Sequence, residues 1–329
     1  MSKVKWGILS TARIGLKKVI PAIQKGRFSE VIAIGSRERA LAEKYAKDLG
    51  IPKAYGSYNE VLSDPEVQAI YIPLPNHLHV EWSLNSMKAG KHVLCEKPIA
   101  RNRAEMDVLL EASKRYSNLK IMEAFMYRFH PQWLTTKDLI SRNEIGELRH
   151  IQSFFFYDNR DPSDIRNIAE YGGGGLLDVG CYCISLARFL FGSEPERAMG
   201  SLEYDPLFKI DRMASGILEF PNGTATFTCG TQASPFQHAT ILGTEGRIEM
   251  DLPINPPLDK PYEILIECGS KCREIELDVT NQFTLQFDRF SEAVIQDTVA
   301  PIPLEDAYNN IKVIDGIMES HKTCKWHII

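Results

Sequence analysis

The sequence predicts two regions of different fold class: an α/β region over residues 1–124 and an α+β region over residues 125–329. In the first region, short β-rich runs alternate with segments of helical periodicity, a pattern typical of a parallel sheet whose strands are joined by helices. In the second region, several strands follow one another and the helices stand apart from them, which indicates an antiparallel or mixed sheet. A length of 329 residues fits two domains of ordinary size.

Strands of the first region are predicted from short apolar and β-branched runs bounded by turn residues. The run 31–35 is apolar throughout, as expected for a strand buried on both faces. The predicted strands are 4–9, 31–35, 54–55, 69–72, 91–95 and 120–123. Strands in this number, with helices between them, predict a doubly wound sheet, in which ligands bind beyond the carboxyl ends of the strands.

Helices of the first region are predicted from apolar residues at helical spacing and from residues that begin or end helices. Gly50 and Pro52 follow the second predicted helix, and glycine favours the left-handed backbone at a helix end. For the fourth predicted helix, Asn76 is the candidate N-cap and Gly90 the candidate stop. The predicted helices are 13–25, 39–49, 58–62, 77–89 and 102–116.

The second region is predicted to hold successive strands with separate helices. A run of four glycines at 172–175 leads into one of these helices. The predicted helices are 131–142, 176–190, 283–295 and 304–318. The predicted strands are 148–157 and a succession over 198–277, with turns at 221–223, 243–246 and 269–270.

Composition excludes several classes of protein. The net charge is -5 and charges of both signs are interspersed, so we expect no nucleic-acid partner. No apolar run approaches the roughly 20 residues of a membrane span, and the first residues lead into strand-like sequence without a secretory-signal pattern. The seven cysteines show neither disulfide nor zinc spacing, which predicts reduced thiols, no bound metal and a cytoplasmic location.

The turn between the first strand and the first helix, Gly7 to Gly15, has the position of a phosphate-binding loop. A G-x-G-x-x-G fingerprint would fall on Ser10, Ala12 and Gly15, of which the last alone is glycine. Small residues still let the backbone approach a pyrophosphate at the helix N-terminus, where amides and dipole favour an anion. The alternative is a small-residue turn without a ligand, but its place at the start of an α/β region favours a dinucleotide.

The end of the second strand bears on which dinucleotide is bound. A site for NAD normally has an acidic residue there, whereas this chain has Ser36 and Arg37, with Arg39 close behind. A hydroxyl and a guanidinium suit the 2′-phosphate of NADP, because arginine offers several donors to phosphate oxygens. We therefore expect NADP in preference to NAD; the alternative is a solvated arginine at a helix start.

Two further motifs carry chemistry. Lys97 follows the fifth strand within Glu96-Lys97-Pro98, and a lysine there can donate to a substrate oxygen; the alternative is a surface Glu–Lys pair. Asp178 and Tyr182 follow the glycine run and are four residues apart, so a regular helix would put them on one face. A phenol and a carboxylate on one face form a candidate acid/base pair, and the alternative is a buried tyrosine bonded to an aspartate.

These motifs, together with the segments 73–79 and 123–131, resemble the glucose–fructose oxidoreductase / inositol dehydrogenase (Gfo/Idh/MocA) family over essentially the whole chain. Tyr182 resembles the branch with glucose–fructose oxidoreductase, NADP-dependent D-xylose dehydrogenases and dimeric trans-1,2-dihydrodiol dehydrogenase; many inositol-type members have histidine there. The resemblance implies a Rossmann domain followed by an α+β domain with an open, mostly antiparallel sheet. That sheet implies a homodimer or homotetramer.

The resemblance also implies an NADP-dependent oxidoreductase that acts on an aldose or cyclic polyol. Tyr182 would take the hydroxyl proton, Lys97 would favour its phenolate, and Asp178 would orient the pair or bind a second hydroxyl. The Lys97–Pro98 peptide would be cis. The residues that the resemblance assigns to the cofactor are Gly7, Ser10, Thr11, Ala12, Arg13, Ile14, Ser36, Arg37, Leu74, Pro75, Asn76, His79, Glu96 and Lys97.

Two other functions stay open. One is a trans-1,2-dihydrodiol dehydrogenase that acts on cyclic diols; the other is a non-catalytic sensor that binds NADP and a sugar without turnover. Retention of Lys97, Asp178 and Tyr182 favours an enzyme over the sensor. Sugar recognition needs several polar groups, and the candidates for substrate contact are Arg128, Arg160 and Arg166, each of which is equally a candidate surface or ion-pairing residue.

Overall fold

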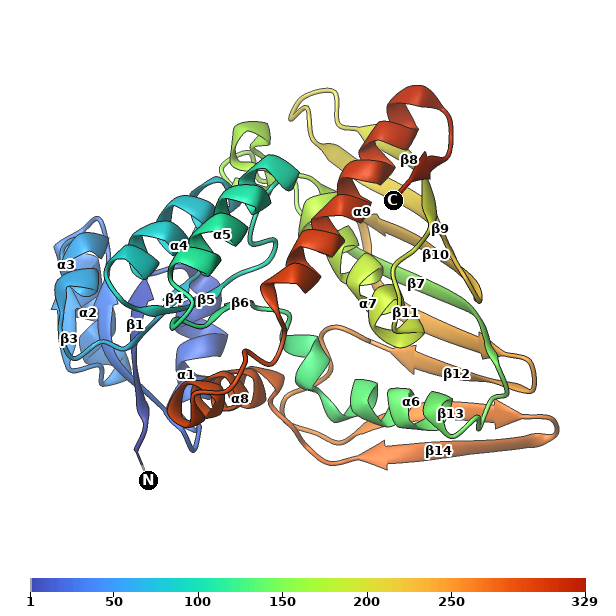
Figure 1. The fold of residues 1–329 in the computed structure, drawn as a ribbon, viewed down its shortest axis with the longest axis horizontal. Helices are drawn as coiled ribbons and strands as arrows, with labels where there is room; N and C mark the ends of the chain where they lie inside the picture. Colours follow the sequence, from blue (N-terminus) through green and yellow to red (C-terminus); the bar gives the residue numbers. More distant parts are fainter. Residues whose placement is uncertain (1) are drawn as a thin grey trace. The chain divides into compact units, whose positions relative to one another are not determined.

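The computed structural model describes residues 2–329, which divide into two compact units (Figure 1). The first unit contains the described residues through Met126 together with Asn281–Tyr308. The second unit contains Tyr127–Thr280 and Asn309–Ile329. The expected division into 1–124 and 125–329 therefore differs from the compact units in the segment Asn281–Tyr308, which returns to the first unit.

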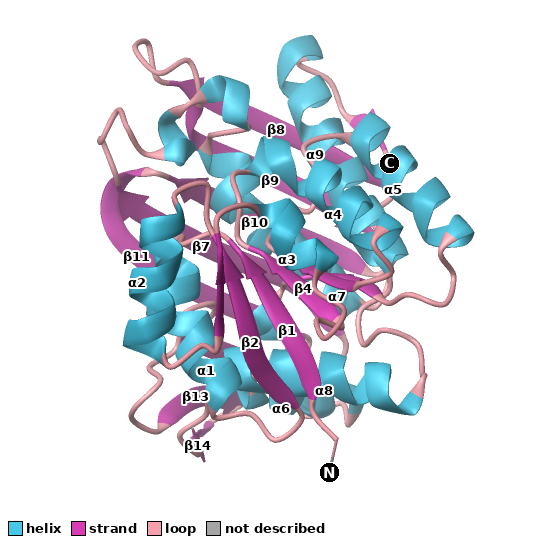
Figure 2. Ribbon diagram, turned by 90° about the vertical axis from the view of Figure 1, so that its left-hand side faces the viewer, coloured by secondary structure: helices cyan, strands magenta, loops and turns pink. Residues whose placement is uncertain are grey.

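The first unit is built on a parallel sheet. Its strands are β1 (Val4–Leu9), β2 (Ser29–Gly35), β3 (Lys53–Tyr55), β4 (Ala69–Ile72), β5 (His92–Cys95) and β6 (Ile121–Glu123). Within the described residues these six strands are ordered β3-β2-β1-β4-β5-β6, and each neighbouring pair is parallel. Figure 2 shows β1 between β2 and β4. The order reverses between β1 and β4, which is the point where doubly wound sheets open a crevice for ligands.

Helices join these strands as predicted, with local differences at two N-termini. The first predicted helix begins with a π-helical turn, η1 (Gly15–Val19), before α1 (Ile20–Gln24). Asn76 is not an N-cap but the first residue of a 3-10 turn, η2 (Asn76–Leu78), which leads into α4 (His79–Lys88). The other helices between the strands are α2 (Arg39–Leu49), α3 (Tyr58–Ser63) and α5 (Arg103–Arg115).

Helix α8 (Gln282–Gln296) belongs to the first unit although it lies far along the chain. The Trp6 ring of β1 packs against Phe287 and Phe290, with ring centroids 4.8 and 5.5 Å apart. The Trp6 indole nitrogen also donates to Ser291 Oγ at 3.1 Å. The helix contacts β1 and β2 (Figure 2). An apolar helix face predicts burial but does not specify which sheet covers it, so this placement depends on tertiary packing.

The second unit is built on a large, mostly antiparallel sheet. Its strands are β7 (Leu148–Asp158), β8 (Arg197–Tyr204), β9 (Asp211–Phe220), β10 (Gly223–Gly230), β11 (Gln232–Gly243), β12 (Gly246–Asp251), β13 (Tyr262–Cys268), β14 (Lys271–Leu277) and β15 (His327–Ile328). In the described part of the chain their order is β14-β13-β12-β11-β7-β10-β9-β8-β15. Strands β7 and β10 run parallel, and the other neighbouring pairs are antiparallel.

Helices lie over this sheet (Figure 1). They are α6 (Pro131–Ser141), α7 (Cys181–Phe191) and α9 (Leu304–Thr323). Short helical turns join them to the strands: η3 (Met126–Phe129), η4 (Ile165–Asn167), η5 (Ala169–Tyr171) and the π-helical η6 (Leu176–Gly180). Helix α7 packs against β7 and β10, and α6 packs against β13.

Among the described residues, the segment Ala169–Phe191 is long and apolar enough to cross a membrane by length and composition alone. This corrects the expectation that no run of that length and apolarity is present. However, 83% of the residues in its most apolar window are buried inside the structure, as in a core helix. Packing of α7 against β7 and β10 already explains the apolar side chains.

Candidate active site

The loop after β1, which is the predicted phosphate-binding turn, contains a residue with a positive φ. Ser10, at the first fingerprint position, has a φ of 121°, a conformation that glycine adopts most easily. Its side-chain oxygen accepts a hydrogen bond from the Ala12 amide at 2.8 Å, which holds the turn. Thr11, Arg13 and Ile14 follow with partly or fully exposed side chains. Serine thus occupies the first fingerprint position in place of glycine, and the turn still leads directly into the helical segment that contains η1.

Gly7 lies inside β1 and not in this turn. A Cβ atom at Gly7 would lie 2.7 Å from Val61 Cγ1, so the residue permits close packing of α3 on the sheet. Gly7 is buried in the sheet, and its assignment to the cofactor stays a prediction. Strand residues alternate between the two faces of the sheet, and this position faces the side that α3 covers.

The residues predicted to bind the 2′-phosphate follow the end of β2. Ser36 is buried and its hydroxyl accepts from the Glu38 amide at 3.2 Å, whereas Arg37 is exposed. Arg39 forms an ion pair of 2.7 Å with Glu60, so its charge is engaged by α3. Tyr58 links this region to the first loop: burial raises its pKa, while Arg37 and a hydrogen bond with Ser10 oppose the rise.

The loops after β4 and β5 lie side by side, because Ile72 pairs with Cys95 at the ends of these strands. Leu74 is buried in the first loop, while Pro75 and Asn76 are half-buried. In the second loop, Glu96 accepts a hydrogen bond of 2.6 Å from the Tyr71 hydroxyl, and Lys97 is half-buried. The Lys97–Pro98 peptide is cis, which confirms the expectation drawn from the resemblance.

His79 lies beneath these two loops instead of on their surface. Its side chain is 1% exposed, and its Nδ1 and Nε2 atoms lie 2.7 Å from Pro98 O and Leu74 O. Burial lowers its pKa to about 4, although both carbonyl contacts favour the charged ring. Since both ring nitrogens face the protein backbone, His79 joins the two loops. Its assignment to the cofactor stays a prediction.

The predicted acid/base pair lies in the second unit, just after the glycine run. Asp178 is in the π-helical turn η6 and Tyr182 is in α7, so the regular α-helical spacing assumed for the pair does not hold between them. Tyr182 is 5% exposed, and its ring packs against Tyr127 and Phe155, with centroids 5.9 and 5.8 Å away. The phenol therefore lies in an aromatic environment.

Asp178 is held by two donors. Tyr157, in β7, donates to its Oδ2 atom at 2.5 Å, and Arg166 Nε lies 3.3 Å from the same oxygen. Burial, followed by the charge of Asp178, raises the pKa of Tyr157 far above its ordinary range. Asp178 likewise raises the pKa of Arg166. The carboxylate is thus stabilised as an acceptor, which suits orientation of a partner better than proton abstraction.

Tyr157 lies outside every motif described above. The one signal for it in the sequence is its place at the end of the aromatic run 154–157, which on its own indicates a strand. Of the arginines considered for substrate contact, Arg166 alone is shown beside Asp178. Arg128 stacks on Phe189, with its guanidinium carbon 4.4 Å from the ring centroid. Arg160 pairs with Asp158 at 3.0 Å.

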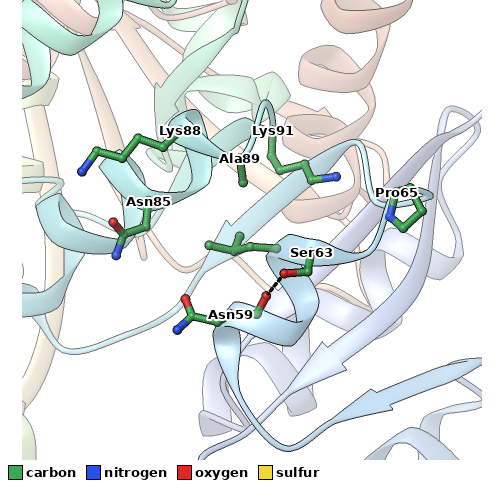
Figure 3. A pocket seen from close by; sticks show the side chains of 8 residues that line it. Asn59, Ser63, Pro65, Asn85, Lys88, Ala89 and Lys91 are labelled. Carbon is green, nitrogen blue, oxygen red and sulfur yellow. Dashed lines mark hydrogen bonds between the residues drawn. The ribbon is translucent and has the colours of Figure 1, made fainter.

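Two hollows lie elsewhere in the described residues. One, of about 250 Å³, is lined by Arg160 together with residues of β7, β8, β9 and β11. The other, of about 710 Å³, is wide open and lies at the amino ends of β4 and β5 (Figure 3). There Ser63 donates to Asn59 O, and Lys91 donates to the carbonyls of Asp64 and Val67. Because ligands of doubly wound sheets bind at the carboxyl ends, this larger hollow is not the cofactor site.

Comparisons with known proteins agree with this architecture. Residues 4–125 match the model of the oxidoreductase family with an NAD-binding Rossmann fold, and residues 133–249 match the GFO/IDH/MocA C-terminal domain. The chain is 41% identical to an uncharacterized oxidoreductase of Rhizobium meliloti over 100% of both chains. It is 34% identical to D-xylose 1-dehydrogenase (NADP(+)) 2 of Haloferax volcanii over 97% of both.

Solved structures show the same fold over nearly the full length. A 3-ketoreductase from Actinomadura kijaniata, in complex with NADP and TDP-benzene, superposes with a TM-score of 0.91 at 28% identity, covering 97% of this chain and 98% of that one. The aldose-aldose oxidoreductase from Caulobacter crescentus superposes with a TM-score of 0.92 over 99% and 100% of the two chains. Its identity of 24% supports the fold alone.

Proposed function

The chain belongs to the Gfo/Idh/MocA oxidoreductase family, and on that premise we propose that it is an NADP-dependent sugar or polyol oxidoreductase. The reaction is the transfer of hydride between a nicotinamide and the carbinol or carbonyl carbon of an aldose or cyclic polyol. The observation that carries the proposal is the hydrogen-bonded carboxylate of Asp178, placed just ahead of Tyr182 in a chain that also has an NAD(P)-binding domain.

The residues at the carboxyl edge of the first sheet fit NADP. The turn at Ser10 has the backbone conformation for close approach of a pyrophosphate, and exposed Arg37 beside Ser36 offers donors to a 2′-phosphate. No acidic side chain stands at the end of β2 before Glu38. The Haloferax relative is named for NADP(+), and the Actinomadura ketoreductase was solved with NADP. These points support NADP over NAD.

When bound, NADP+ would accept the hydride in oxidation and NADPH would donate it in reduction. Tyr182 exchanges the proton of the reacting hydroxyl. A phenol with the ordinary pKa of about 10 is a weak base at neutral pH, so Tyr182 needs a cation, and we assign this role to Lys97. Asp178 orients the substrate or Tyr182, and its contacts with Tyr157 and Arg166 hold its carboxylate in place. Leu74, Pro75, Asn76, Glu96 and Lys97 are assigned to the nicotinamide end.

We also propose that the chain forms a homodimer or homotetramer through the second sheet. Large apolar side chains are exposed on its strands, among them Met213 and Ile217 of β9 and Phe236 and Leu242 of β11. Although β7 and β10 lie between these two strands, all four side chains belong to one sheet, and exposed apolar groups gathered on one sheet are typical of a surface that pairs with another molecule. Light scattering after size-exclusion chromatography tests this, and a monomer at micromolar concentration would exclude it.

A spectrophotometric screen tests the activity. Aldoses, cyclic polyols, cyclic diols and a nucleotide-linked ketosugar are incubated with NADP or NADPH and, in parallel, with NAD or NADH. We expect turnover with an aldose or polyol that is faster with NADP, and its loss in a Tyr182→Phe variant. Binding of NADP without any turnover would favour the sensor. Turnover restricted to cyclic diols would identify the dihydrodiol dehydrogenase instead.

A further inference from the structure

Asp211, the first residue of β9, lies at the beginning of the helix that carries Asp178. Its side chain is 5% exposed, and its Oδ2 atom accepts a hydrogen bond of 2.6 Å from the Leu176 amide. The amides of Gly175 and of Asp211 itself also donate to this carboxyl. The first amides of a helix need such acceptors, and the preceding Gly175 has no side chain that could supply one. Asp211, a strand residue 35 positions from Leu176, supplies the acceptor instead.

The glycine run is shaped around this carboxyl. Gly174 has a φ of 118°, and a Cβ atom there would lie 2.0 Å from Asp211 Oδ1. A Cβ atom at Gly175 would lie 3.4 Å from Asp211 Oδ2, and one at Gly173 would lie 2.4 Å from the Arg166 carbonyl. The absence of side chains in the glycine run therefore lets the Asp211 carboxyl approach it on one side and the backbone of Arg166 on the other.

The charge of Asp211 is coupled to the same cluster. Burial raises its pKa to about 7; the three amides oppose this rise, and the charge of Asp178 adds to it. Two other titratable groups face it from neighbouring strands, Tyr204 of β8 and Cys229 of β10, and its charge raises the pKa of both. Ionisation of Asp211 near neutral pH therefore changes the field at Asp178 and the strength of the amide contacts.

We propose that Asp211 is a positioning residue for the reaction, which holds the start of the Asp178 and Tyr182 helix through Leu176 and the glycine run. This inference rests on the proposed function of Asp178 and Tyr182. Asp211 touches no reacting atom; it acts through the helix, because a carboxyl that fixes the first turn also fixes the direction of the side chains that follow.

The test compares Asp211→Asn with a matched control, Asp205→Asn. Asp205 is also buried, at 8% exposure, and accepts from the amides of Leu207 and Phe208 at 2.7 and 2.8 Å, but it lies in the turn between β8 and β9. For Asp211→Asn we expect kcat to fall roughly 10- to 100-fold, with the KM for NADP nearly unchanged. The pH profile of kcat should also lose an ionisation near neutrality. Asp205→Asn should keep the wild-type kcat and profile.

Amide hydrogen exchange over residues 172–182 measures the positioning without turnover. We expect faster exchange in this segment for Asp211→Asn than for the wild type and for Asp205→Asn, at equal melting temperature or after correction for it. Unchanged exchange, or a wild-type kcat with a wild-type pH profile, would overturn the inference. If the wild-type protein turns over no substrate, the proposed function fails, and the exchange experiment still decides whether Asp211 holds the helix.

Discussion

The Tyr157 hydroxyl donates a hydrogen bond of 2.5 Å to Asp178 Oδ2, the same oxygen that Arg166 Nε approaches at 3.3 Å. The two donors come from different parts of the chain, one from β7 and one from η4. A carboxylate with a phenol and a guanidinium on one oxygen is stabilised in its charged form. Asp178 is therefore a fixed anion close to the start of α7, and its neighbours determine how firmly it is held.

Removal of the phenol tests this arrangement. Tyr157→Phe removes a hydrogen bond to a charged group while it keeps the ring, so we expect kcat/KM to fall roughly 10-fold or more. The KM for NADP should change little, because Tyr157 belongs to the second unit. Steady-state kinetics measure both quantities. Tyr262→Phe, which removes the hydroxyl of another buried tyrosine on β13 of the same sheet, is the matched control and should retain wild-type kinetics.

The proposed roles of Lys97 and Tyr182 predict that substitution of either residue lowers turnover and leaves the affinity for the cofactor nearly unchanged. Lys97→Met and Tyr182→Phe should each lower kcat by about 100-fold or more, because proton transfer by a positioned side chain contributes that much. Fluorescence titration with NADPH should give nearly unchanged affinity. Lys88→Met, at the hollow on the amino side of the sheet, is the control for removal of a lysine. Near wild-type rates in both active-site variants would disprove the assignment.

The 2′-phosphate site predicts a selective effect on NADP. Arg37→Ala should weaken NADP binding roughly 10- to 100-fold, since a hydrogen bond to a charged group is lost, and should leave NAD binding close to its wild-type value. Arg39→Ala removes a guanidinium that is already paired with Glu60 and should affect NADP much less. Isothermal titration of the wild type and the two variants with each dinucleotide gives the six affinities that the comparison needs. Equal losses for NADP and NAD would show that Arg37 does not read the 2′-phosphate.

Asp211 predicts a dependence of stability on pH. Its pKa is about 7 in the folded protein against about 3.9 in an unfolded chain, so the folded state holds a proton that the unfolded state releases. This stabilisation is complete below about pH 4 and is lost as the pH rises through about 7. The free energy of unfolding, measured by urea denaturation, should therefore fall more steeply with pH in the wild type than in Asp211→Asn.

Another buried group changes stability in the opposite direction. The pKa of His79 is lowered to about 4, so its contribution is present above about pH 6.5 and is lost as the pH falls through about 4. The His79 contribution is the same in the wild type and in Asp211→Asn, so the difference between their free energies of unfolding reports on Asp211. A difference that stays constant across this pH range would show that the Asp211 carboxyl does not titrate there.

The sequence by itself determined the elements and the local motifs. Strands β1 and β4 and helix α2 have the predicted bounds, because apolar periodicity and turn residues act over a few neighbouring positions. The loops after β1, β2 and β5 were likewise predicted, since a parallel sheet brings the carboxyl ends of its strands to one edge. The cis peptide at Lys97–Pro98 followed from resemblance to the family.

Only the tertiary structure decided which distant residues support these motifs. Tyr157 and Asp211 reach the Asp178 helix from strands 21 and 35 residues away in the sequence. His79 is inside the protein beneath two loops, and α8 returns to the first sheet. The physical reason is that strand register and helix packing set these contacts across the chain. A local pattern states that a side chain is buried, but its partners depend on the elements that pack around it.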